Sequence, residues 1–167
     1  MALIVEDGTG KSDAESYLSV ADATTYAGKY GLTFSGTSTQ QEEALRLATQ
    51  YLDARFNTLW LGERSNEKQA LDWPRRALLD ADGFLISSTA MPQALKDATA
   101  ELAIKARSET LMPDVSDPGT IASEDVQVGD LRVATSYHGG RSQFKLYRKV
   151  DGLLRDLVLS GARVTRA

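Results

Sequence analysis

Residues 39–56 read TQQEEALRLATQYLDARF, and this stretch decides the fold class that we predict. Its apolar residues recur at the spacing of one helix face, while charged and amide side chains occupy the opposite face. The apolar face consists of Ala44, Leu45, Ala48, Tyr51, Leu52 and Phe56. Thr39 and Glu42 stand at the spacing of a capping box, which places the helix start at this threonine. The stretch therefore predicts a helix that buries one side in a core.

Working outward, three more segments have helical patterns. Ser19 precedes a helix over 20–30 that ends at Gly31, because a serine caps a helix start and a glycine suits the position after its end. A second helix begins at Pro92 and continues to about Arg107. Residues 146–159 predict a short helix with an apolar stripe and a basic opposite face.

Strand signals are shorter than the helical ones. Residues 77–86 and 126–133 each place apolar residues on both sides of a turn, around Gly83 and Gly129, and so predict two β-hairpins. Residues 2–6 predict a short N-terminal strand. The expected fold is mainly α: a small helical bundle with short β-hairpins, this N-terminal strand and an extended basic C-terminal arm or helix. We divide it into a helical body with β-hairpins, residues 1–137, and a basic C-terminal arm, residues 138–167.

The sequence DGTGKS at residues 7–12 resembles the end of a phosphate-binding loop. A complete loop of that kind requires a further glycine where this chain has Val5, and it runs directly into a helix N-terminus. Asp13 and Glu15 instead bring negative charge to the place where a phosphate would bind. We therefore interpret the stretch as a glycine-containing turn after the N-terminal strand.

The composition excludes several classes of site. The 167 residues include no cysteine and one histidine, His138, which removes disulfides, thiolate metal sites and the usual zinc and Ser-His-Asp arrangements. We expect no catalytic residues, no cofactor and no metal, and hence no enzyme. No apolar run has the length of a membrane span, and the N-terminus lacks the positive segment and the long apolar core of a secretion signal, so we expect a cytosolic product unless assembly carries it elsewhere.

Charge is unevenly distributed along the chain. The net charge is −4, yet the segment from His138 onward holds seven basic and two acidic residues, a charge of +5, which leaves −9 on the preceding residues. An acidic body with a basic tail indicates docking on an acidic partner or a position near DNA phosphates, although a solvated tail without a partner has the same composition.

Aromatic and basic residues alternate near the C-terminus. Tyr137, Phe144 and Tyr147 are interleaved with Arg141, Lys145, Arg148 and Lys149. Such a pattern suits single-stranded DNA, whose bases stack on aromatic rings while cations contact the backbone. It equally suits an amphipathic segment that inserts into the groove of a partner protein. The sequence alone leaves both possibilities open.

Several linear motifs carry a family resemblance: ALIVEDGTG at 2–10, SYLSVAD at 16–22 with Tyr26, ATQYLDAR at 48–55, QALDWPR at 69–75, Asp82-Gly83 and MPQALKDATAELA at 91–103. The chain resembles a tailed-phage family labelled DnaT-like single-stranded-DNA-binding proteins, and that family is similar to the head-tail connector, or adaptor, proteins of the phage neck. The match extends from the first residue to about Ala103 and resumes at residues 150–154. Residues 110–149 match least.

The resemblance implies a structural connector subunit of a virion neck, present in the host cytoplasm during assembly. Its implied partners are further copies of itself in a dodecameric ring, the portal protein, a downstream neck or tail-completion protein, and genomic DNA that passes through without sequence-specific binding; no membrane is implied. The docking element would be residues 148–167. The suspected portal-docking residues are Arg148, Lys149, Val150, Leu153, Leu154, Arg155, Leu157, Val158, Arg163 and Arg166. The alternative function is a single-stranded-DNA-binding module.

Overall fold

The computed structural model describes residues 2–80, 82–113, 123–128, 131–136 and 145–159, with the backbone alone for 123–128 and 131–136. The chain separates into two compact units. The first, which we call the body, consists of Met1–Leu111 together with Tyr147–Ala167, and the second is Met112–Leu146. The expected division between residues 137 and 138 falls on residues outside the described ones and stays a prediction.

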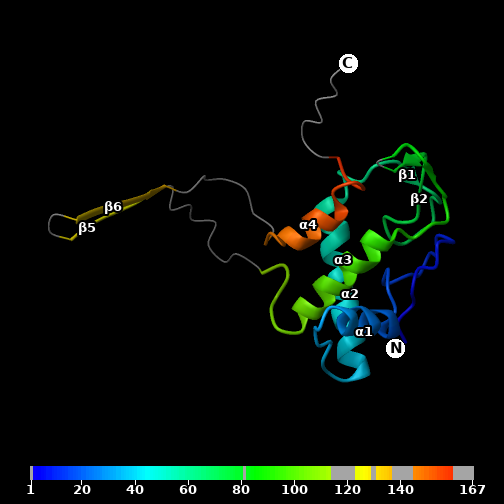
Figure 1. Ribbon diagram of the computed structural model, residues 1–167, viewed down its shortest axis with the longest axis horizontal. Coiled ribbons are helices and arrows are strands. Elements are labelled where there is room, and N and C mark those ends of the chain that lie inside the picture. The colour runs from blue at the N-terminus through cyan, green and yellow to red at the C-terminus, as the bar shows by residue number, and fades with distance from the viewer. Residues whose placement is uncertain (1, 81, 114–122, 129–130, 137–144, 160–167) are drawn as a thin grey trace, which may run out of the picture. The chain divides into compact units, whose positions relative to one another are not determined.

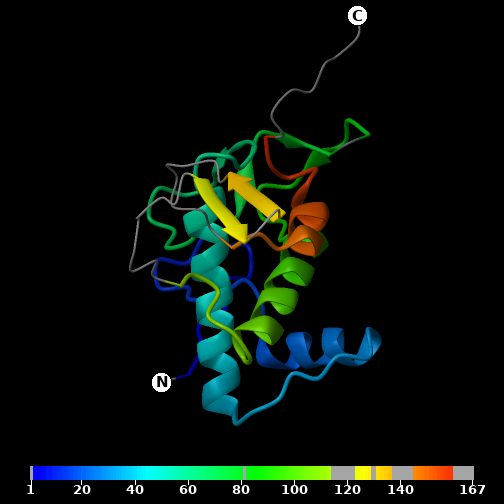
Figure 2. The same ribbon diagram turned by 90° about the vertical axis from the view of Figure 1, so that its left-hand side faces the viewer.

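The body contains the four helices of the described chain. They are α1 (Val20–Lys29), α2 (Ser38–Phe56), α3 (Gln93–Ala106) and α4 (Arg148–Leu154). The helices α2 and α3 lie side by side, α1 lies across one end of the pair, and α4 packs against α3 (Figures 1 and 2). A mainly helical fold with short hairpins is therefore confirmed.

The helix ends follow the local chemistry of the sequence. The side chain of Ser19 accepts a hydrogen bond of 3.1 Å from the Asp22 amide and caps α1. Helix α2 begins two residues earlier than predicted, because Thr37 rather than Thr39 caps it and Gln40 completes the capping box. The side-chain oxygen of Gln40 accepts a hydrogen bond from the Thr37 amide, and a glutamine can take this role in a capping box as a glutamate can. Helix α4 is shorter than the predicted span of 146–159.

The core lies where the four helices meet. Leu45, Ala48 and Leu52 of α2 face inward as the periodicity predicts, and they are fully buried. The other helices contribute Ala23, Ala27, Leu95, Ala98, Leu102, Val150 and Leu154, and the loop after α2 adds Trp60 and Trp73. The small alanines on α1 and α3 let the helices approach closely.

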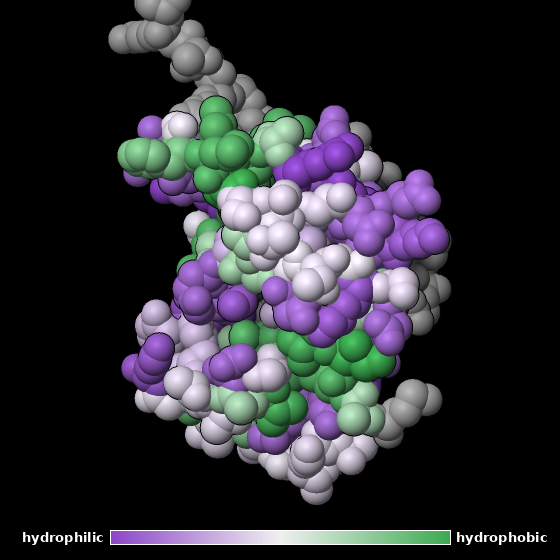
Figure 3. All heavy atoms as spheres, turned by 90° about the vertical axis from the view of Figure 1, so that its right-hand side faces the viewer, coloured by the Kyte–Doolittle hydropathy of each residue, from purple (hydrophilic) through white to green (hydrophobic). Residues whose placement is uncertain are grey.

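Short antiparallel strand pairs complete both units. In the body, β1 (Glu63–Arg64) pairs with β2 (Arg75–Arg76), and β3 (Leu78–Leu79) pairs with β4 (Leu85–Ile86). The second pair is the predicted hairpin of residues 77–86, and it projects with apolar side chains at the upper edge of the body (Figure 3). The pairing of β1 with β2 is not apparent in the sequence.

The second unit contains the other predicted hairpin. Its strands β5 (Ser123–Val128) and β6 (Leu131–Ser136) pair in an antiparallel register that sets Val126 opposite Val133. The expected N-terminal strand is reduced to one parallel bridge between Val5 and Ser16. This segment thus pairs within its own chain.

Candidate functional site

The loop at residues 6–11 folds around its own carboxylate. Glu6 is buried, and its carboxylate accepts hydrogen bonds from the amides of Gly8 and Gly10, both at 2.9 Å, and of Lys11, at 2.8 Å. Converging amides of this kind bind an anion, such as a phosphate, in nucleotide-binding loops. In this chain the anion is the side chain of Glu6, so these three amides are already engaged.

The same loop also packs tightly against other segments. Gly8 and Gly10 have positive φ angles of 99° and 74°, and a β-carbon on Gly8 would lie 1.9 Å from the Thr89 carbonyl oxygen. The Lys11 ammonium donates to the Val5 carbonyl and pairs with Asp7. The sequence DGTGKS thus resembles a nucleotide-binding loop because it forms a similar turn, in which the Glu6 carboxylate takes the place of the phosphate.

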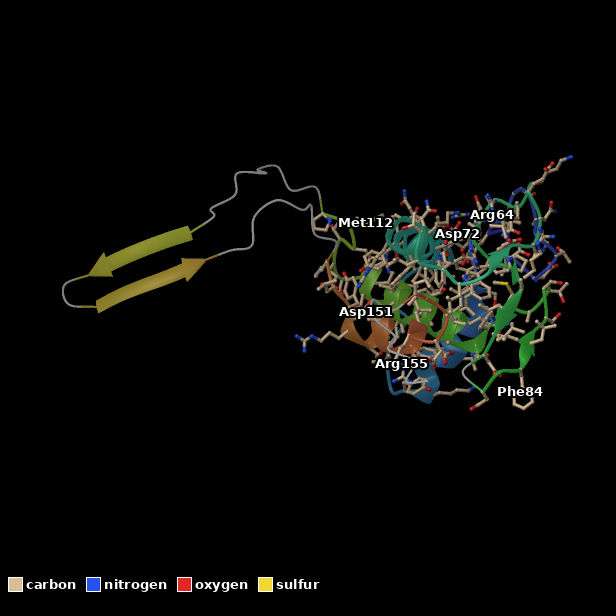
Figure 4. The ribbon with its side chains drawn as sticks, turned by 90° about the horizontal axis from the view of Figure 1, so that it is seen from above. Arg64, Asp72, Phe84, Met112, Asp151 and Arg155 are labelled. Carbon is tan, nitrogen blue, oxygen red and sulfur yellow. The ribbon has the colours of Figure 1, made fainter. Side chains whose placement is uncertain are left out.

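A second group of ionisable residues joins α2 to the loop that follows it. The Tyr17 hydroxyl donates to Asp53 and accepts from the Asp72 amide at 3.1 Å. Burial raises the pKa of Asp53 to about 7, and the nearby charge of Asp72 adds to this rise. Burial also raises the pKa of Asp72, which Figure 4 shows beside Arg64.

The motif QALDWPR supplies most of the remaining bonds around this group. The buried guanidinium of Arg75 donates to the carbonyls of Leu61 and Gly62, both at 2.7 Å. Gln69, also buried, donates to the carbonyls of Leu71 and Pro74. The Trp73 ring is fully buried against Trp60. Since Arg75 and Gln69 donate to backbone carbonyls, we interpret the motif and its carboxylates as a tie that holds the loop to the core.

A third group reaches the surface through Tyr30 and Lys149, while Tyr26, Glu101 and Tyr147 lie buried beneath them. We call this group the basic-aromatic face: Tyr26, Tyr30, Glu101, Lys105, Tyr147 and Lys149. At the end of α1, the rings of Tyr26 and Tyr30 lie 4.6 Å apart at an angle of 43°. The Lys149 ammonium, at the start of α4, lies 5.1 Å from the centre of the Tyr30 ring and 5.9 Å from that of Tyr26. These distances are within the range of cation-π attraction.

Glu101 of α3 holds this arrangement from below. It is 5% exposed, and its carboxylate accepts from the Tyr26 hydroxyl at 2.8 Å and pairs with Lys149. Burial is the main cause that raises the pKa of Tyr26 above its usual range, and the hydrogen bond to Glu101 raises it further. The hydroxyl therefore keeps its proton and donates to Glu101. One turn further along α3, the Lys105 ammonium lies 5.6 Å from the centre of the Tyr147 ring.

The outer layer of the face is open to solvent. Tyr30 is 57% exposed and the side chain of Lys149 is 51% exposed. Lys29 and Arg148, their neighbours in sequence, are exposed as well. An accessible ring among several cations can stack a planar base and contact an anionic backbone.

The suspected docking residues take different positions in the structure. Val150, Leu154 and Leu157 are buried in the body, and Leu153 and Val158 are half-buried. The backbone of residues 157–159 pairs with residues 59–61, through the bonds from Leu61 to Leu157 and from Leu159 to Leu59. Arg148, Lys149 and Arg155 are exposed, while Arg163 and Arg166 lie outside the described residues. A docking role for this set stays a prediction.

Only some of the alternating aromatic and basic residues near the C-terminus belong to the basic-aromatic face. Tyr147 is buried, and it packs edge-on against Tyr51 at 5.4 Å, so its ring is not an open platform. Tyr137, Arg141 and Phe144 lie outside the described residues. The accessible ring of the basic-aromatic face is that of Tyr30. The sequence did not indicate this residue, because its contact with Lys149 joins positions far apart in the chain.

Two further structural findings concern metals and membranes. Among the residues that the structure describes, no group of three or more histidine or carboxylate side chains is placed to hold a metal ion. Within the same residues, none of the helices has the length and apolar character needed to cross a membrane.

Comparison with known proteins matches the whole chain to one protein family. The family model that matches is described as "Putative DnaT-like ssDNA binding protein", and it covers residues 1–167. The chain belongs to this DnaT-like family. Searches of curated proteins and of solved structures found no match.

The main functional prediction from sequence, a structural head-tail connector of a phage neck, is wrong on this finding, because the description of the family that matches the whole chain names single-stranded DNA binding and no connector. The associated descriptions as a virion structural protein, an adaptor, a portal-binding protein and a ring subunit are corrected with it. Their basis was linear motifs such as QALDWPR, whose buried side chains hold a loop and therefore carry information about the fold rather than about assembly. The family supports the alternative, a single-stranded-DNA-binding module.

Proposed function

We propose that this chain binds single-stranded DNA at the basic-aromatic face, as a module without catalysis. The observation that carries the proposal is the exposed ring of Tyr30 with the Lys149 ammonium 5.1 Å from its centre. Membership of the DnaT-like family supports the class of ligand. The net charge of −4 makes the whole surface unsuited to DNA, so contact has to concentrate where cations cluster.

Each group on the face has a distinct role in this proposal. Tyr30 stacks on a base, and its exposed ring gives it the area to do so. Lys149 contacts a phosphate, and the exposed Lys29 and Arg148, which precede Tyr30 and Lys149 in sequence, add positive charge. Glu101 keeps Lys149 beside the rings, because the buried carboxylate anchors the ammonium of this flexible side chain.

Fluorescence anisotropy with a labelled oligothymidylate tests the stacking role. We expect Tyr30→Ala to weaken binding by about 5-fold to 150-fold, which corresponds to the roughly 1 to 3 kcal/mol that one stacked base contributes. Tyr30→Phe keeps the ring and should bind like the unmodified chain. Leu47→Ala is the matched control, because Leu47 is similarly exposed but lies on α2 outside the face.

Salt dependence tests the phosphate contact. For single strands, the logarithm of the binding constant falls with the logarithm of salt concentration by about 0.7 for each phosphate neutralised. We expect Lys149→Gln to reduce this slope by about that amount and to weaken binding to several sequences equally. Unchanged binding by Tyr30→Ala, or an unmodified chain that fails to bind the oligonucleotide at low salt, would contradict the proposal.

A further inference from the structure

The β3–β4 hairpin exposes more apolar surface than its fold requires. Phe84 and Leu85 are 72% and 74% exposed, and Leu79, which pairs with Leu85 across the hairpin, is 56% exposed. Phe84 points away from the body in Figure 4, and the apolar projection at the upper edge of Figure 3 lies at this hairpin. Leu78, by contrast, is buried and anchors the hairpin to the body.

Two more leucines extend this surface. Leu59 and Leu159 are exposed and adjacent, since the Leu159 amide donates to the Leu59 carbonyl at 2.7 Å. They lie on the segments next to the hairpin, where Gly62 approaches Leu78 and Arg76. The exposed apolar residues of the hairpin and of the segments beside it are Leu59, Leu79, Phe84, Leu85 and Leu159, and we call this set the hairpin patch.

The size of the hairpin patch points to an interaction surface. At their exposed fractions, five side chains of this size present on the order of 500 Å² of mostly apolar area. Contiguous apolar patches of about 300 to 600 Å² are the largest on typical monomers and are often functional. Two such patches together would bury about 1,000 Å², which is the size of a weak interface.

The acidic turn of the hairpin disfavours DNA as its partner, and its charges suit a second copy of the same hairpin. Asp80 and the exposed Asp82 stand at its turn, where their charge would repel phosphates. At its base lies Arg76, whose side chain is exposed and pairs with Glu63 at 3.3 Å. When two hairpins pair antiparallel about a two-fold axis, the acidic turn of each lies beside the basic base of the other. In this arrangement Arg76 exchanges its exposed pair with Glu63 for Asp82 of the other copy.

Strand pairing adds a second reason. Neither β3 nor β4 has a further strand partner among the described residues, so each leaves an outer edge of backbone amides and carbonyls. Such edges pair readily with another strand, and a two-stranded hairpin is only marginally stable alone. A partner hairpin would satisfy the edge and cover the apolar side chains together.

From the patch, its charges and its open edges, we propose that the β3–β4 hairpin is the contact of a weak symmetric dimer of this chain. The dimer buries Phe84 and Leu85 of both copies and sets Asp82 of each copy against Arg76 of the other. Its area lies at the low end of specific interfaces, where association is weak. The contact lies on different residues from the basic-aromatic face and does not depend on DNA binding.

Sedimentation velocity of the full chain, without DNA, tests the dimer over a concentration series around the micromolar range. We expect the unmodified chain to shift from monomer to dimer, and Phe84→Asp to remain monomeric with an unchanged thermal melting curve, because Phe84 is exposed in the monomer. Leu47→Asp places the same charge on an exposed leucine outside the patch and should associate normally.

A charge exchange makes the test specific. Asp82→Arg should weaken the dimer at least several-fold, because it sets two arginines together, and adding Arg76→Asp in the same chain should restore it. A chain that stays monomeric at all concentrations, or a Phe84→Asp variant that dimerises like the unmodified chain, would overturn the proposal. Either result would leave the DNA-binding proposal standing, since that is measured at another face with another ligand.

Discussion

At the scale of single residues, the loop at residues 6–11 shows why a short motif can mislead. Its glycines and converging amides are the features of a phosphate-binding loop, but the buried Glu6 carboxylate occupies the position of the anion. The glycines remain necessary for a different reason. Gly8 has a φ of 99° and lies against the Thr89 backbone, where no side chain fits.

Two glycine substitutions with opposite expected signs test this interpretation. Gly8→Ala should lower the free energy of unfolding by about 2 to 4 kcal/mol, because it combines a disfavoured backbone angle with a clash against a fixed carbonyl. Gly28→Ala should raise it by up to about 1 kcal/mol, because Gly28 lies within α1 with open space around it. Urea denaturation measures both. Equal effects of the two variants would mean that Gly8 is not held against Thr89.

At the scale of elements, α4 carries two kinds of residue with separate tasks. Its buried side, Val150 and Leu154, packs into the core with α3. Its exposed side presents Arg148 and Lys149, and Arg55 of α2 ties the helix down through a 2.7 Å ion pair with Asp151. The helix thus positions Lys149 over Tyr30 through contacts made on its opposite side.

Truncation of the buried side should therefore cost stability. We expect Leu154→Ala to lower the free energy of unfolding by about 2 to 5 kcal/mol, since Leu154 is fully buried and its loss leaves a cavity. Leu146→Ala, a few residues away, should change it by less than about 0.5 kcal/mol, because Leu146 is exposed. Chemical denaturation followed by circular dichroism compares the two. A small effect of Leu154→Ala would show that α4 contributes little to the core.

At the scale of the whole molecule, the polar tie around Tyr17 links folding to pH. Burial raises the pKa of Asp53 from 3.8 to about 7 in the folded chain, so the folded state holds a proton that the unfolded state has released over this range. Protonated Asp53 therefore stabilises the folded chain fully at a pH below 3.8, and this stabilisation is lost as the pH rises through about 7. Burial raises the pKa of Asp72 too, and its contribution has the same sign.

The free energy of unfolding should consequently fall as the pH rises through this window. Asp53 alone contributes a decrease of up to about 1.4 kcal/mol for each pH unit. Asp53→Asn keeps an oxygen that accepts from Tyr17 but cannot ionise, so we expect it to reduce the slope and to leave the smaller part due to Asp72. The exposed Asp13→Asn is the control and should keep the original slope. Urea denaturation at several pH values measures this, and an unchanged slope in Asp53→Asn would contradict the assignment.

Much of the fold follows from the sequence, whereas little of the candidate site does. The caps at Ser19 and in the 37–40 box, the helical periodicity of α2 and α3, and the turn between β3 and β4 involve residues within a few positions of one another, and each was predicted to within a few residues. The site depends on Tyr30, which follows α1, Glu101 of α3 and Lys149 of α4. No local pattern links them.

The amino-acid sequence by itself determined the mainly helical class, the two hairpins, the absence of cysteine chemistry and an excess of basic residues near the C-terminus. The reason is that helix caps, turns and periodicity act over short distances along the chain. Only the tertiary structure decided that Glu6 fills its own loop, that Asp53 is buried, and that Lys149 lies beside the exposed ring of Tyr30. These outcomes depend on burial and on contacts between residues far apart in sequence, and packing of the whole body is what brings them together.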